Sequence, residues 1–146
     1  MKNRTYFLLF PLLLASASLV AQQAEKTLVK SFNLNGQSAV LLDVAGNVTV
    51  TTWNEPQMRI QMTITLQNGS ETMLKSLVTA GRYNLDAKEV NGAYSIVAPG
   101  LERQIKLGSG QLLGETVSYT VLAPKDVIVT TRPSGNLPEA AATSSF

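Results

Sequence analysis

The segment Met58–Leu66, with the sequence MRIQMTITL, constrains the fold more than any other stretch of the chain. Large apolar side chains occupy every second position, and Arg, Gln and Thr fill the positions between them. This period of two predicts a half-buried β-strand. Burial of its five apolar side chains contributes on the order of 10 kcal/mol as an upper estimate. A slip of one residue would expose all five, so the register is fixed.

Similar patterns predict further strands on both sides of this segment. Ala45-Gly46 and Asn91-Gly92 are short connections that β-hairpins prefer. We therefore expect residues 40–44 and 47–53 to pair antiparallel, with Val48 and Val50 facing inward and the threonines outward. The predicted strands are residues 28–34, 40–44, 47–53, 58–66, 82–90, 93–99, 116–124 and 126–131, with a weaker one at 104–107 before a glycine-rich loop.

The apolar period changes to that of a helix after residue 69. Met73, Leu74, Leu77 and Val78 recur at helical spacing, and Ser70 precedes them as an expected N-cap. Together these patterns predict a mostly β protein of antiparallel sheets, arranged as a sandwich or a short β-solenoid, with one short helix near 70–80. Periodicity does not determine how distant strands pair, so both arrangements stay open.

The first 21 residues have the pattern of a secretory signal peptide. Two cationic residues precede an apolar run of about nine residues and a small-residue segment ending at Ala21. A membrane-spanning helix needs about 20 apolar residues, so we expect cleavage after Ala21, or after Ala17, rather than a permanent anchor. The protein is then exported, to the periplasm, the outer surface or the medium.

Composition divides the remainder into two parts. Residues 22–131 are enough for a single β-rich domain, whereas residues 132–146 are rich in small and polar residues and predict a disordered tail. Without Lys2 and Arg4, the 12 Lys plus Arg fall to 10, against 10 Asp plus Glu. A formally neutral chain lacks the clustered cations that nucleic acids require, and the sequence has no cysteine for disulfides.

The residue types give little support to an enzyme. The sequence has no histidine, and its glycine-rich segment Gly108–Glu115 lacks the Lys-Ser/Thr ending of a phosphate loop. We predict no catalytic residue, metal site or cofactor. The alternative is a small carbohydrate-active enzyme that uses paired surface carboxylates. Its candidate groups, each at a polar position or turn, are Asp43, Glu55, Asp86, Glu89, Glu102, Glu115 and Asp126.

Threonines and the only tryptophan mark the candidate binding surface. Thr49, Thr51 and Trp53 share one face of a predicted strand, and Thr63 and Thr65 repeat the pattern on the neighbour that we expect. Cross-strand threonine pairs stabilise sheets without any ligand. The functional interpretation is a flat surface for a glycan or a protein, anchored by Trp53.

Several segments together resemble the adhesin-like β-strand-repeat domains of unknown function from Bacteroidetes cell envelopes. The resemblance covers about Leu28–Thr131 and includes a Gly-Asn-Val strand opening, Trp53 before a turn, Arg82-Tyr83, and Tyr119 ahead of a proline. The segments that carry it are LLDVAGNVTVTTWNEPQMRIQMTI, AGRYNL, YSIVAP and GETVSYTVLAPKDVIV.

The resemblance implies an exported β domain with no known active site, and a short member that lacks most of a C-terminal β-solenoid. Its last strand would then present an unpaired edge at Val127, Ile128 and Val129, which favours weak self-association or a partner that adds a strand. We thus expect a non-catalytic envelope scaffold or adhesin-like binding module. A truncated remnant without an independent role is a further alternative.

Overall fold

The strand predicted at Met58–Leu66 lies at the centre of the observed fold. The computed structural model describes residues 23–133, and this strand is labelled β4 in it. Met58, Ile60, Met62, Ile64 and Leu66 are each 1% exposed or less. The predicted strand and its register are confirmed.

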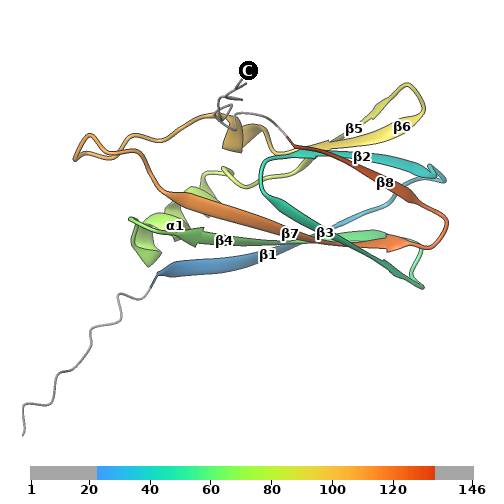
Figure 1. Ribbon diagram of the computed structural model, residues 1–146, viewed down its shortest axis with the longest axis horizontal. Helices are drawn as coiled ribbons and strands as arrows, with labels where there is room; N and C mark the ends of the chain where they lie inside the picture. The colour runs from blue at the N-terminus through green and yellow to red at the C-terminus, as the bar shows by residue number, and fades with distance from the viewer. Residues whose placement is uncertain (1–22, 134–146) are drawn as a thin grey trace, which may run out of the picture.

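Within residues 23–133, eight strands form two four-stranded sheets that face each other across the core (Figure 1). Sheet A has the order β1 (Ala24–Phe32), β4 (Met58–Leu66), β7 (Glu115–Pro124), β3 (Asn47–Trp53). Sheet B has the order β5 (Asp86–Val90), β6 (Ala93–Val97), β2 (Ala39–Val44), β8 (Ile128–Pro133). The other elements are helix α1 (Glu71–Thr79) and a 3-10 turn (Pro99–Glu102). The mostly β prediction is confirmed, and the arrangement is a sandwich.

Both sheets are mixed, whereas antiparallel sheets were predicted. Strand β3 pairs in parallel with β7, and β2 pairs in parallel with both β6 and β8. The predicted hairpin between residues 40–44 and 47–53 is wrong, because the chain crosses from sheet B to sheet A at Ala45-Gly46. Gly46 has φ +128°, and a Cβ there would lie 2.2 Å from the Val117 carbonyl oxygen. The connection is therefore a tight corner between sheets.

The helix and the second hairpin form as predicted. The Ser70 hydroxyl accepts a hydrogen bond from the Met73 amide and caps α1. Asn91 and Gly92 have φ of 51° and 75° and connect antiparallel β5 and β6. Positive φ at both central residues gives the tight turn that Asn-Gly favours.

Other boundaries differ from the prediction. Strand β5 begins at Asp86 rather than at residue 82, because the four residues before it turn after the helix. The segment expected to hold a weak strand contains only an isolated bridge between Lys106 and Leu112. Strand β8 continues through Pro133, two residues into the predicted tail. The signal peptide at 1–21 and the rest of the tail lie outside the described residues.

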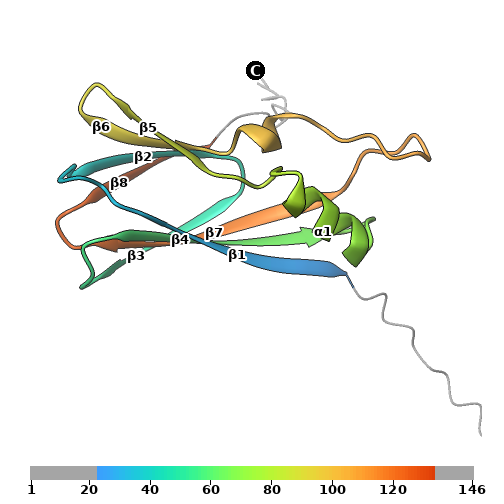
Figure 2. The same ribbon diagram turned by 180° about the vertical axis from the view of Figure 1, so that it is seen from behind.

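The two long sides of the sandwich differ. Strands β1 and β5 line one side, where the Lys30 ammonium donates a hydrogen bond to the Leu85 carbonyl just ahead of β5. Helix α1 contacts β1 on this side (Figure 2). Strands β3 and β8 line the other side. Among residues 23–133, no helix is long and apolar enough to cross a membrane.

Candidate functional site

The predicted binding residues all lie on the outer face of sheet A, which we call the threonine face. Its side chains alternate along each strand with the buried side chains of the core. The strand registers place the following residues on it: Glu25, Thr27, Val29 and Ser31 of β1; Arg59, Gln61, Thr63 and Thr65 of β4; Thr116, Ser118, Thr120 and Leu122 of β7; Asn47, Thr49, Thr51 and Trp53 of β3.

The structure divides these predicted residues into two groups. Strand β7 separates β3 from β4, so the expectation that they are neighbours is wrong. Thr49 lies beside Thr120 of β7. The Thr63 hydroxyl lies 3.3 Å from that of Thr27, and the Thr65 hydroxyl donates to Glu25 at 3.3 Å. Thr63 and Thr65 therefore stabilise the pairing of β4 with β1.

Strand β3 is an edge strand, which changes the environment of its inward residues. Val48 and Val50 face inward, as predicted, because their partners Tyr119 and Val121 on β7 are buried. Val50 is nevertheless 42% exposed. No described strand covers the outer edge of β3, and water therefore reaches this side chain.

Trp53 is held in place at the end of the threonine face. Its indole Nε1 donates a hydrogen bond to the Gln57 carbonyl at 2.9 Å. The guanidinium of Arg59 lies 4.9 Å from the centre of the ring, a cation–π distance. The half-buried side chain thus closes the β3–β4 turn and also borders the surface beyond it.

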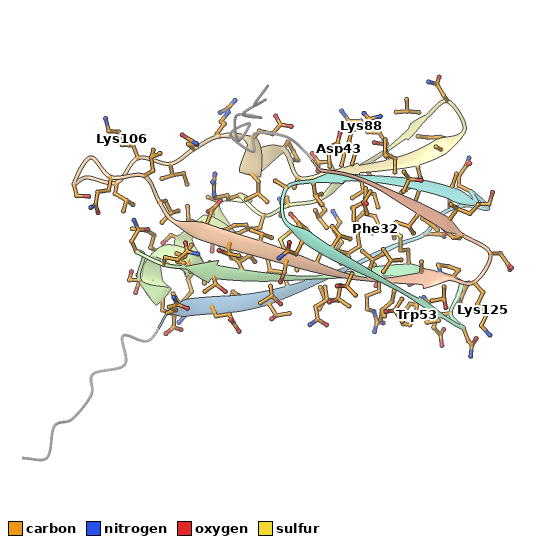
Figure 3. The ribbon with its side chains drawn as sticks, viewed as in Figure 1. Phe32, Asp43, Trp53, Lys88, Lys106 and Lys125 are labelled. Atoms are coloured by element: carbon orange, nitrogen blue, oxygen red, sulfur yellow. The ribbon has the colours of Figure 1, made fainter. Side chains whose placement is uncertain are left out.

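A hollow surface lies beyond Trp53, where three loops meet at one end of the sandwich. We call it the loop-end recess. It consists of two adjoining hollows of about 350 and 270 Å³ that share Pro56, Pro124 and Asp126. The first is also lined by residues 33–38 and Val127, and the second by Trp53, Asn54, Glu55 and Lys125. Figure 3 shows Trp53 and Lys125 together at this end.

The lining of the recess combines side-chain amides, carboxylates, an ammonium group and an indole. Asn33, Asn35 and Gln37 contribute amides from the β1–β2 loop, and Gln37 is itself tied to Glu89 by a hydrogen bond of 2.9 Å. Glu55 and Asp126 contribute carboxylates from the other two loops. These groups donate and accept hydrogen bonds with little net charge.

A buried ion pair at the opposite end has a structural role. Arg82 donates to both carboxylate oxygens of Glu115, at 3.0 and 2.6 Å, and to the Gly100 carbonyl at 2.8 Å. The Tyr83 hydroxyl donates to the same carboxylate at 3.2 Å. Burial, together with the charge of Glu115, raises the pKa of Tyr83 to about 12. The network fixes the segment after α1 against the start of β7.

Burial and the charge of Glu115 also raise the pKa of Tyr119 above its ordinary value. Sequence reasoning singled out Arg82, Tyr83 and Tyr119 through the resemblance alone. The contacts of Arg82 and Tyr83 with Glu115 were not predicted, because those partners lie more than 30 residues apart. A charged residue at the start of a strand, as at Glu115, carries no signal of a buried pair.

The remaining candidate carboxylates do not gather at one place. Asp43 lies on the outer face of sheet B, beside Arg132 of β8 in the strand register. Asp86 lies on the same face, and Figure 3 shows Asp43 and Lys88 on that side. Glu55 and Asp126 line one hollow together. Among residues 23–133, no three acidic side chains form a cluster that could hold a metal ion.

The predicted partner-edge residues Val127, Ile128 and Val129 lie at the start of β8 and in the turn before it. Strand β8 begins at Ile128, so Val127 belongs to the preceding turn and lines the recess. Ile128 is 72% exposed, and Val129 faces inward opposite Val40 of β2. On its other side, β8 has no strand partner among the described residues.

Comparisons with known proteins give little further information. No family model matches the sequence, and no curated protein matches it. Among solved structures, a "putative cell adhesion protein" from Clostridium sporogenes aligns over 73% of this chain at 12% identity, with a TM-score of 0.40. The aligned part spans 45% of that protein's length.

Proposed function

We propose that this chain is an exported, adhesin-like binding module without catalytic activity, and that it binds a glycan in the loop-end recess beside Trp53. The observation that carries the proposal is the meeting of three loops around Pro56, Pro124 and Asp126 next to a fixed indole. Loops at the end of a rigid sandwich are a common place for binding surfaces.

The chemistry of the recess fits a neutral, polyhydroxylated ligand. Sugar hydroxyls both donate and accept hydrogen bonds, and the amides of Asn33, Asn35 and Asn54 can do the same. The carboxylates of Glu55 and Asp126 accept strong, charge-assisted hydrogen bonds. The volume of the larger hollow is near the lower end of the usual range for small-ligand sites.

The indole of Trp53 supplies the apolar contact that a sugar ring requires. Its hydrogen bond to Gln57 and the stacked Arg59 fix its orientation before a ligand arrives. A side chain that is already ordered loses little conformational entropy on binding. The outward residues of β3 and β7 on the threonine face are uncharged, and they would extend the contact to a longer saccharide.

The test begins with a screen of the purified protein against immobilised glycans, and calorimetry then gives the affinity for the best one. Trp53→Ala and Asp126→Asn should each weaken binding about tenfold or more, as for central contact residues. Trp53→Phe keeps an aromatic ring and should lose less. Asp86→Asn on β5 is the matched control for Asp126→Asn, since both side chains are exposed, and it should bind like the parent.

Two outcomes would contradict the proposal. Absence of binding to any glycan, with the fold intact by circular dichroism, would reject glycan recognition. Hydrolysis of a bound glycan that is abolished in Glu55→Gln or Asp126→Asn would instead support the carbohydrate-active enzyme, because these two carboxylates line the same hollow.

A further inference from the structure

The four edge strands of the sandwich differ in charge. Strand β1 carries Glu25, Lys26 and Lys30, and β5 carries Asp86, Lys88 and Glu89. Charged side chains, lysine above all, are the usual protection of a sheet edge against pairing with another chain. The side lined by β1 and β5 is protected in this way.

The opposite side lacks that protection. All seven residues of β3, Asn47–Trp53, are uncharged, and β8 is uncharged from Ile128 to Thr131. Neither stretch contains a proline. Strands β3 and β8 lie toward the viewer in Figure 1, and their outer edges have no strand partner among the described residues. The sandwich thus has two unprotected edges along a single side, which we call the open side.

Apolar side chains on the open side are left partly in water. Val50 points into the sandwich but is 42% exposed, and Val129 of β8 is only half-buried. Ile128, on the outer face of β8, is 72% exposed. A strand added along each edge would cover these side chains and would pair the free backbone groups.

We propose that the open side is the interface for a second copy of this chain, which adds its own β3 and β8 edges in the antiparallel sense. The two edges have nearly the same alternating sequence, VTVTT at 48–52 and VIVTT at 127–131. Opposing edges therefore bring valine and threonine together and place no like charges opposite each other, which is favourable across strands. Related by a two-fold axis, the copies continue both sheets.

The experiment is sedimentation velocity on the purified protein over a range of concentrations. The parent should shift from monomer to dimer as concentration rises. Val50→Lys and Ile128→Lys each place a charge on an edge strand of the open side, in a stretch that is otherwise uncharged. Each should raise the dissociation constant of the dimer about tenfold or more.

The matched controls are Val29→Lys on β1 and Val90→Lys on β5. Both valines are exposed, at 58% and 49%, but they belong to the protected edges. These variants should dimerise like the parent. Because the side chain of Ile128 is mostly in solvent, Ile128→Lys keeps the test valid if Val50→Lys fails to fold.

A parent that stays monomeric at every concentration would overturn the proposal. The open edges would then serve a different partner or none. Equal weakening of the dimer by the control variants would also overturn it, since self-association would then use another surface. A dimer weakened by Val50→Lys or Ile128→Lys alone supports it.

Discussion

The Arg82–Glu115 and Lys75–Glu71 ion pairs differ in the extent to which water reaches them. The side chains of Arg82 and Glu115 are 9% and 14% exposed, whereas those of Lys75 and Glu71 are 64% and 72% exposed. Removal of one partner from a buried pair leaves the other charge uncompensated in a poorly solvated site. An exposed pair is screened by water and contributes little.

Glu115→Gln should therefore lower the free energy of unfolding by about 3 kcal/mol, because the guanidinium of Arg82 stays buried without its counter-charge. Glu71→Gln is the matched control and should leave the midpoint of urea unfolding unchanged. Urea unfolding followed by circular dichroism measures both. Equal shifts of the two midpoints would contradict the structural role of the buried network.

At the scale of the element, local patterns predicted strands and helices well but misjudged one connection. Alternation identified β4 and its buried side, and the Ser70 cap identified α1. The Ala45-Gly46 connection has the length of a hairpin, but here it carries the chain between sheets. Local turn chemistry does not distinguish the two cases, because the partner of β3 is β7, about 70 residues later. Parallel pairing between distant strands does not change the alternation of apolar and polar residues within each strand.

Gly46→Ala tests the corner. A Cβ at Gly46 would lie 2.2 Å from the Val117 carbonyl oxygen, at a φ of +128° that other residues rarely adopt. The substitution should lower the free energy of unfolding by about 2 kcal/mol. Gly108→Ala is the control, because nothing lies within 4 Å of a Cβ there, and it should change stability by about 0.5 kcal/mol or less. Equal losses of unfolding free energy in Gly46→Ala and Gly108→Ala, measured by urea unfolding, would argue for an ordinary hairpin.

At the scale of the whole molecule, the recess could not be read from the sequence. Its three loops, at 33–38, 53–57 and 124–127, are brought together by sheet topology, and only Trp53 gave a local signal. The threonine face was predictable as a face, because alternation determines which way side chains point. Its extent across β7 and β1 was not, since the order of the strands depends on packing between distant segments.

The most direct test of the central claim is a nuclear magnetic resonance titration of the ¹⁵N-labelled protein with the glycan that binds best. The account predicts the largest shift changes at the Trp53 indole and at backbone amides of residues 33–38, 54–55 and 125–127. The backbone amide shifts of residues whose side chains face outward on sheet B should stay unchanged. Shift changes confined to sheet B, or none at saturating glycan, would contradict a glycan site in the loop-end recess.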